Sequence, residues 1–428
     1  MIKVLLLLLT FLLGEQTSAQ QQRISKEDWQ SDVRYLHKTV HESFPFLFKK
    51  TTAKEFDSKV DNLYKNIPEM EDHEIVVGFA KIVSSFKYGH TKLSFGSSPV
   101  PIEQLPLKIY EFTDGIYITG AHKDYRSILG TKITKIEDKP IADVLKAVYP
   151  VVPAENEYYF KAYGISYALM PAILHSQKIT ENLQDNIKFT LEKEGKQFNT
   201  IVSVKRNISF PWQYGEAEPN DDWVWARDLS GTPLYLKNLE KKHAYEYLQN
   251  EKALYVRSSQ ILDNPNESMI SFYKRVFSFV ENNEVEKLII DLRLNGGGNN
   301  FNNKAVVTGI IEQRKINQKG KLFVIIGRRT FSAAQNLVNR LENYTNVTFV
   351  GEPTAENINF YGDAKRIRLP KSRLNVYLSF AWWQDKAMWA NADYTRPDIK
   401  VQMTFEEYRS NQDPVLDVIL AKNTQKEY

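Results

Sequence analysis

The stretch Lys287-Leu-Ile-Ile-Asp-Leu-Arg-Leu-Asn-Gly-Gly-Gly298 decides the fold, because an apolar run passes directly into three consecutive glycines. A short, continuous apolar run bounded by turn residues is typical of a strand that is buried on both faces. Glycines that follow such a strand let the backbone turn tightly and expose its N–H groups to a ligand. The stretch therefore predicts a buried strand that ends in an open loop.

Similar strands, with helices between them, surround this stretch. Apolar runs predict strands at 254–257, 323–327 and 347–351. Apolar residues at helical spacing predict one helix from Asn264-Pro265 onwards and another that begins near Ser332. Strands that alternate with helices form a mainly parallel sheet. We therefore expect residues 151–428 to form an α/β core.

The first part of the chain has a different pattern. Capping boxes and apolar residues at helical spacing predict helices within residues 20–98. From residue 99 to 150 the pattern changes to short strands, with a hairpin turn at Asp114-Gly115. The predicted protein is thus of the α/β class, with an N-terminal helical domain over 20–98 and a small β-rich module over 99–150.

The composition narrows the class of protein. Of the 428 residues, 42% are hydrophobic and 25% are charged, which suits a globular fold. The net charge of +4 is small and no basic stripe is present, so nucleic acid is not an expected partner. The chain has no cysteine, which excludes disulfides, thiolate metal sites and cysteine catalysis.

Two loop segments carry candidate chemistry. The backbone of Gly296, Gly297 and Gly298 could surround a phosphate or an oxyanion, or simply make a tight turn. The spacings of known phosphate-binding loops are absent, which disfavours a phosphate. Ser332, in Thr330-Phe-Ser-Ala-Ala-Gln335, follows a predicted strand at the edge where open α/β sheets place their sites. This serine is either a helix cap or a nucleophile.

A histidine far upstream could serve as the base. His90 lies in Lys87-Tyr-Gly-His-Thr-Lys-Leu93, between a predicted helix and a predicted strand. Histidine accepts protons near neutral pH, although an isolated histidine is more often structural. His37 and His41 share one helix face, but this spacing alone is weak evidence for a metal. We therefore expect no metal and no cofactor.

Together these motifs resemble those of the tail-specific, or C-terminal processing, serine protease superfamily of the S41 type. The blocks that carry the resemblance are Gly-His-Thr at 89–91, Asp-Leu-Arg-x-Asn-x-Gly-Gly at 291–298, Thr-Phe-Ser-Ala-Ala at 330–334, Val-Gly-Glu-Pro-Thr at 350–354 and Arg-Pro-Asp-Ile at 396–399. The glycine and serine blocks are the most specific. Residues 128–145 also resemble the PDZ-type module that these proteins often contain.

The resemblance implies a crotonase-like ββα core and a PDZ-like β module at 99–150. It also implies that Ser332 attacks a peptide carbonyl, and that the backbone N–H groups of Gly297 and Ala333 form the oxyanion hole. The implied partner is a polypeptide or peptide substrate.

Two branches of this superfamily differ in the residue that acts as the base. One branch uses a Ser-Lys dyad, but Asn357 stands at the expected lysine position here, and an amide cannot deprotonate serine. The other branch resembles the tricorn core protease and the interphotoreceptor retinoid-binding protein repeats, and it has histidine in the Gly-His-Thr block. That resemblance implies His90 as base and Asp393 as its acid. An unperturbed histidine has a pKa of about 6.5, so the rate should rise with pH around that value. Ala355-Glu356 departs from a glycine pair that is usual in the family.

Two functions stay open at this point. The resemblance favours an exported serine endopeptidase or C-terminal processing peptidase. The alternative is a catalytically silent homologue that binds a peptide or a lipid in the same cleft, because a fold does not fix a function.

The first residues indicate export. A basic start, the apolar run Val4–Leu13 and the small residues of Thr17-Ser-Ala19 match a secretory signal peptide over 1–19. The apolar run is shorter than the ~20 residues that a membrane span needs, although a retained anchor is the alternative. A periplasmic or extracellular protein without a membrane span after signal removal is therefore expected.

We predict that signal peptidase cleaves after Ala19, so that the mature chain begins at Gln20. N-terminal sequencing of exported protein would check this. Exported protein that still begins at Met1 would contradict the cleavage and favour the retained anchor.

Overall fold

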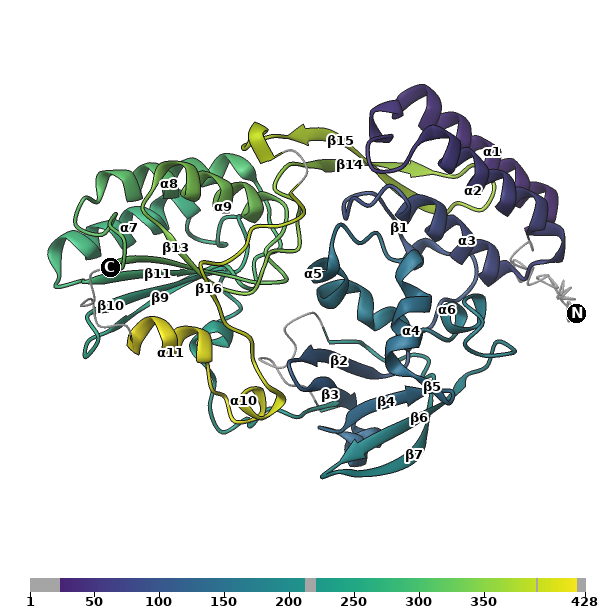
Figure 1. Ribbon diagram of the computed structural model, residues 1–428, viewed down its shortest axis with the longest axis horizontal. Helices are drawn as coiled ribbons and strands as arrows, with labels where there is room; N and C mark the ends of the chain where they lie inside the picture. Colours follow the sequence, from purple (N-terminus) through teal and green to yellow (C-terminus); the bar gives the residue numbers. More distant parts are fainter. Residues whose placement is uncertain (1–23, 212–220, 390–391, 422–428) are drawn as a thin grey trace, which may run out of the picture.

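The computed structural model describes residues 24–211, 221–389 and 392–421. These residues form a helical layer, a β-rich module and an α/β domain, and a long hairpin runs between the first and the last (Figure 1). The predicted signal peptide, residues 1–19, lies outside the described residues. Among the described helices, none is both long and apolar enough to cross a membrane.

The α/β domain is built on a six-stranded sheet with the order β16-β13-β12-β11-β10-β9. Its strands are β9 (His243–Leu248), β10 (Ala253–Ser258), β11 (Lys287–Asp291), β12 (Leu322–Ile326), β13 (Thr348–Gly351) and β16 (Ile399–Lys400). Neighbouring strands are parallel except for β9 with β10. The predicted, mainly parallel α/β core is therefore confirmed.

Helices cover both faces of this sheet (Figure 1). They are α7 (Met269–Asn282), α8 (Asn303–Glu312) and α9 (Ala333–Tyr344) on one face, and α11 (Pro414–Ala421) on the other. In β12, Val324 and Ile326 pack with the first set, whereas Phe323 and Ile325 pack with α11. Because both faces are buried, the strands are continuous apolar runs in the sequence.

The helical layer consists of α1 (Lys26–Ser43), α2 (Ala53–Asn66) and α3 (Asp72–Ser84). The side-chain oxygens of Ser25 and Thr52 accept N–H groups of the first turns of α1 and α2, as helix caps do. The face of α1 with Trp29, Val33 and Val40 is buried. The helices predicted from the apolar spacing are thus present.

The β-rich module is larger than the sequence indicated. Its seven-stranded sheet contains β2 (Leu107–Phe112), β3 (Gly115–His122), β4 (Lys132–Ile136), β5 (Lys139–Pro140), β6 (Asn186–Lys193), β7 (Lys196–Ser203) and β8 (Trp223–Trp225). Because β6 pairs with β4, and β8 with β3, the sheet does not end at the predicted boundary of residue 150. The strands β6, β7 and β8 therefore belong to the module and not to the α/β core.

Helical segments link the module to its neighbours. They are α4 (Ile141–Val148), α5 (Glu157–Tyr159), α6 (Pro171–Ser176) and α10 (Phe405–Arg409). In α10, Phe405 and Tyr408 pack against Phe112 of β2, so the last part of the chain returns to the module.

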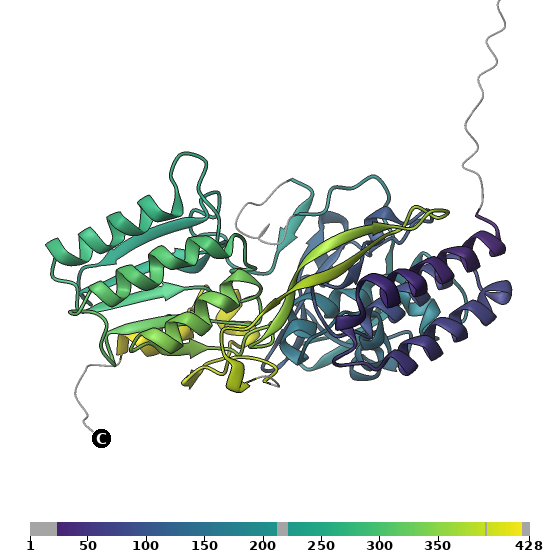
Figure 2. The same ribbon diagram turned by 90° about the horizontal axis from the view of Figure 1, so that it is seen from above.

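A long hairpin connects the α/β domain to the helical layer. It consists of β14 (Phe360–Arg368) and β15 (Asn375–Trp383), and it reaches from the α/β domain to the helical layer (Figures 1 and 2). β1 (Lys92–Leu93), which follows α3, pairs with β15 in the antiparallel sense. This pairing fixes the segment immediately before β1, which contains His90, relative to the α/β domain.

A buried carboxylate holds the tip of the hairpin. Asp32 of α1 is 0% exposed, and its two oxygens accept the backbone N–H groups of Lys371 (3.0 Å) and Ser372 (2.7 Å). Hydrogen bonds to a charged acceptor are the strong ones. Asp32 thus anchors the hairpin to the helical layer at the end opposite the α/β domain.

We predict that Asp32→Ala lowers the free energy of unfolding by roughly 2–4 kcal/mol, because two buried N–H donors lose their acceptor. Asp32→Asn keeps one acceptor oxygen and should cost less. The measurement is the shift in the urea midpoint.

Asp28 provides the control for this change. Its side chain forms an exposed ion pair with Lys371 (3.1 Å), so it also joins α1 to the tip of the hairpin. Exposed pairs contribute at most about 1 kcal/mol, so Asp28→Ala should change the midpoint little. Equal effects of Asp32→Ala and Asp28→Ala would show that the buried carboxylate does not anchor the hairpin.

Candidate active site

Three loops meet at the carboxyl edge of neighbouring parallel strands. The glycine loop follows β11, Ser332 follows β12, and the loop with Glu356 follows β13. Ligand sites of open α/β sheets are found at this edge. The sheet order alone therefore brings together segments that are 24 to 35 residues apart in the sequence.

Ser332 adopts a backbone conformation that is rare for residues other than glycine, with φ 58° and ψ −128°. It precedes α9, but its side chain makes no capping hydrogen bond. The interpretation as a helix cap is therefore not supported. Strained residues persist only where the surroundings hold them in place, and they cluster at functional sites.

His90 lies in the turn between α3 and β1, and its Nε2 atom is 3.0 Å from Ser332 Oγ. The imidazole ring stacks between Phe331 (4.6 Å between centroids) and Phe360 (5.9 Å). Two aromatic faces thus fix the orientation of the ring. The structure brings together the two residues that the sequence analysis named as nucleophile and base.

The turn before His90 is closely packed. A side chain at Gly89 would place a Cβ atom 2.3 Å from the ring of Tyr159 and 2.8 Å from that of Phe331. Only glycine lets the backbone approach these rings so closely. Gly89 therefore determines how near His90 comes to Ser332.

The electrostatic environment of His90 differs from the expectation. Burial, with a smaller effect from the charge of Lys92, lowers the pKa of His90 to about 3. Its Nδ1 atom has no hydrogen-bond partner among the described residues and lies 3.7 Å from Glu356 Oε2. The expected titration near neutral pH does not allow for this burial. His90 is therefore neutral, and able to accept a proton, across the physiological range.

A pair of buried glutamates lies beside His90. Glu356 is 0% exposed, and its Oε2 atom accepts the backbone N–H of Ser332 (2.8 Å). Glu155 is 5% exposed, and its Oε1 atom accepts the N–H of Gly89 (2.7 Å). Burial and the charge of Glu155 raise the pKa of Glu356 well above its usual range. The raised pKa thus favours a proton on Glu356.

Asn357 and Asn156 hold the two loops of this pair together. Asn357, which occupies the position expected for a dyad lysine, donates its backbone N–H (3.1 Å) and its side-chain amide to Glu155. The Asn156 amide donates to the carbonyl oxygens of Ala355 (3.0 Å) and Asp393 (2.6 Å). Both asparagines therefore position the site, and neither can act as a base.

Asp393 does not lie beside His90. Its side chain is 62% exposed, and its carboxylate is 4.0 Å from the ammonium of Lys50. Because Asn156 holds the backbone carbonyl of Asp393 inward, its carboxylate points to the surface. Glu356 takes the place next to His90 instead. In the sequence, its only signal is a glutamate where the resembling family usually has glycine.

Gly297 lies against Ser332, the predicted nucleophile. Its φ is +104°, and a Cβ atom there would lie 2.5 Å from Ser332 Cβ and 2.9 Å from Ala333 N. The N–H of Ala333 has no hydrogen-bond partner within the described residues. However, the N–H of Gly297 is donated to the side chain of Asn295 (3.0 Å). Of the two predicted oxyanion donors, the N–H of Ala333 is therefore available to a ligand, whereas the N–H of Gly297 is already bonded to Asn295.

The residues His90, Glu155 and Glu356 have the composition of a metal site, but most of their ligand atoms already have hydrogen-bond partners. One ligand atom from each of His90, Glu155 and Glu356 lies within 4.8 Å of the others. The glutamate oxygens accept N–H groups of Ser332, Gly89 and Asn357, and His90 Nε2 faces the serine. Only His90 Nδ1 and Glu356 Oε1 lack a hydrogen-bond partner among the described residues, so the cluster does not offer a full set of free metal ligands.

No protein-family model matches the chain, and no curated protein matches it. Solved structures are similar. Mature CPAF complexed with lactacystin is 12% identical, with a TM-score of 0.61 over 90% of this chain and 95% of that one. A serine-to-alanine mutant of CPAF is 11% identical, with a TM-score of 0.63 over 94% and 99% of the chains. CPAF is an S41-family peptidase, so this chain has the fold of that family.

We predict that His90 stays neutral at pH 5, because burial disfavours the imidazolium. The ¹⁵N chemical shifts of the histidine ring, assigned with His90→Gln, would show this. Since the folded pKa lies below the unfolded value of about 6.5, the folded state should lose stability as pH falls from there towards 3. A titration midpoint of His90 near neutrality would contradict the prediction.

Proposed function

We propose that this chain is an exported serine peptidase in which Ser332 is the nucleophile and His90 is its base. The observation that carries the proposal is the 3.0 Å contact between Ser332 Oγ and His90 Nε2 at the carboxyl edge of the sheet. A serine hydroxyl is a weak nucleophile until a base removes its proton. A neutral imidazole at this distance can remove that proton as the oxygen attacks a peptide carbonyl.

Glu356 takes the role that the sequence analysis gave to Asp393. Its carboxyl group faces His90 Nδ1, where it would stabilise the imidazolium that forms when His90 accepts the serine proton. Glu155 shares the charge of the pair and positions Glu356. The buried pair therefore supplies negative charge to His90 without a solvent-exposed carboxylate.

The oxyanion of the tetrahedral intermediate would form next to α9. The free N–H of Ala333 is the first donor, and it lies at the positive end of the helix. Gly297 becomes the second donor when the oxygen of Asn295 releases its N–H. Substrate binding and the opening of this hydrogen bond would thus occur together.

The likeness to CPAF in fold supports the proposed class of substrate, a polypeptide or peptide. A cavity of about 340 Å³ adjoins Gly327, Arg328 and Arg329, the turn that leads to Ser332, and lies against β2 of the β-rich module. It is a candidate pocket for a substrate side chain. We assign the core as crotonase-like, the β-rich module as PDZ-like, and the chain to the histidine branch of the superfamily, because Asn357 replaces the dyad lysine.

One observation favours the second candidate, a silent homologue that binds a peptide or a lipid. The engaged N–H of Gly297 leaves the oxyanion hole incomplete in this structure. A protein that never releases this hydrogen bond would bind a ligand in the cleft without cleaving it.

Fluorophosphonate labelling and cleavage of labelled casein would test the proposal. We predict that Ser332→Ala abolishes labelling, and that Ser332→Ala and His90→Ala each lower kcat/KM by at least about 10³-fold. The double variant should be no worse, because the two residues act as one unit. A folded wild-type chain that neither labels nor cleaves would favour the silent homologue.

The acid is tested by a matched pair of isosteric changes in the same assay. Glu356→Gln should lower kcat/KM roughly 10²–10⁴-fold, because an amide facing His90 cannot take on negative charge when the imidazolium forms. Asp393→Asn removes a charge at the surface and should leave the rate unchanged. The reverse order of these effects would restore Asp393 as the acid.

A further inference from the structure

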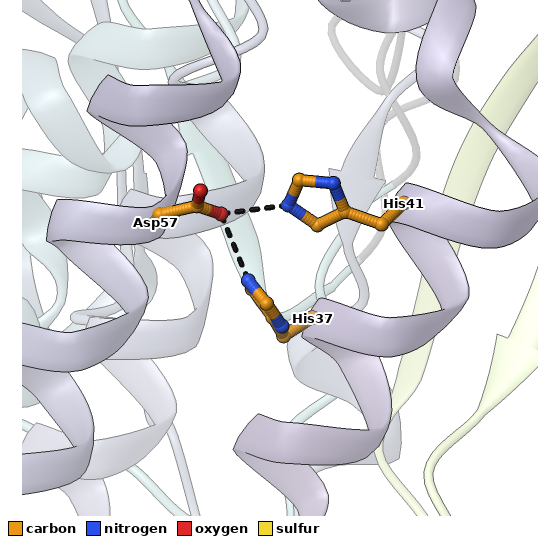
Figure 3. Close-up of side chains that lie close together, drawn as sticks. All are labelled: His37, His41 and Asp57. Carbon is orange, nitrogen blue, oxygen red and sulfur yellow. Dashed lines mark hydrogen bonds and ion pairs between the residues drawn. The ribbon is translucent and has the colours of Figure 1, made fainter.

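Far from Ser332, two histidines and one aspartate meet between the first two helices. His37 and His41 lie one turn apart on α1, and their Nε2 atoms are 2.8 Å and 2.7 Å from the same oxygen, Oδ1 of Asp57 on α2 (Figure 3). One ligand atom from each residue lies within 4.8 Å of the others. The i,i+4 spacing that was weak evidence in the sequence thus acquires a third ligand in the structure.

The two imidazole rings are held in place before any ligand arrives. His37 stacks on Phe56 with an angle of 5° between the rings and 6.0 Å between centroids. His41 packs against Phe48 at 5.2 Å. Phe56 is fully buried, so the ring that supports His37 belongs to the core. Rigid support of this kind is what a metal site needs to keep its ligands in position.

We propose that His37, His41 and Asp57 bind one divalent cation of the zinc type. Two imidazoles and a carboxylate are ligands that zinc prefers, and three protein ligands leave a fourth position for water. Ligand atoms at zinc distances of about 2.0–2.1 Å are roughly 3.3 Å apart in a tetrahedron. The observed 2.7–2.8 Å contacts need to open by only about half an ångström for an ion to replace the bridging hydrogens.

The site is open to solvent and built for binding. The side chains of His37, His41 and Asp57 are 31%, 34% and 41% exposed, so an ion and its water can reach them. In metalloprotease helices with the pattern His-Glu-x-x-His, the glutamate after the first histidine is the general base. Here Lys38 occupies that position, so the site lacks the base for hydrolysis. The ion would cross-link α1 to α2 within the helical layer.

This proposal does not depend on the proposed peptidase activity. Among the described residues, the only other cluster with metal-ligand spacing contains His90. The experiment must therefore distinguish the two clusters. Changes at His41 or Asp57 should strongly weaken binding at the helical site, whereas His90→Ala should leave it intact.

The test is calorimetric titration of the purified, untagged chain with ZnCl₂, together with melting curves with and without zinc. We expect one zinc ion per chain and a rise in Tm. His41→Ala and Asp57→Asn should each weaken binding by at least about 100-fold, since even the loss of a supporting residue costs 10–100-fold. Asp57→Asn keeps the shape of the side chain. It therefore still tests the site if His41→Ala fails to fold.

Asp61→Asn is the matched control. It breaks an exposed ion pair with Arg34 (2.8 Å) between the same two helices without touching a ligand, and zinc binding should persist. No zinc binding by the folded wild-type chain would overturn the proposal. Binding that survives His41→Ala but is lost in His90→Ala would overturn it too, and would assign the ion to the candidate active site.

Discussion

The candidate active site depends on one contact between side chains that are 242 residues apart. His90 Nε2 lies 3.0 Å from Ser332 Oγ. The histidine belongs to the helical layer and the serine to the α/β domain. The contact therefore exists only if the two parts keep a fixed position relative to each other. The hairpin of β14 and β15 does this. It leaves the α/β domain, pairs with β1 two residues after His90, and ends on the buried carboxylate of Asp32. A site divided in this way requires an anchored hairpin.

Burial sets the protonation states of the site. Removing His90 from water keeps its imidazole neutral, and burying Glu356 next to Glu155 favours a proton on Glu356. Both groups are thus ready for proton transfer at neutral pH. Since opposite charges interact strongly in a site with little water, the charge that develops on His90 during the reaction would be stabilised where it forms.

The sequence predicted the parts of the site that follow from local pattern. An apolar run ending in glycines, and a serine after the next strand, identify the edge of a parallel sheet, and His90 stands out by the residues around it. The acid was misplaced at Asp393 because spacing along the chain does not say which way a side chain points; Asn156 turns that carboxylate outward. The end of the β-rich module was missed for a similar reason, since β6 joins β4 through pairing between distant residues. Asp57, the third residue of the proposed metal site, lies on α2, so no pattern within α1 could indicate it.

Glu356 also explains how Ser332 keeps its rare backbone conformation. A residue other than glycine at φ 58° costs about 1–3 kcal/mol, so neighbouring contacts must hold it. Glu356 accepts the Ser332 N–H, the carbonyl of Asn295 accepts the N–H of Phe331 (3.1 Å), and Asn303 donates to the carbonyl of Ala333 (2.8 Å). Ser332 and the residues on both sides of it are thus fixed by the loop after β13, by the glycine loop and by the start of α8. The carboxyl group that faces His90 therefore also fixes Ser332, the proposed nucleophile, so the geometry and the charge of the site cannot vary independently.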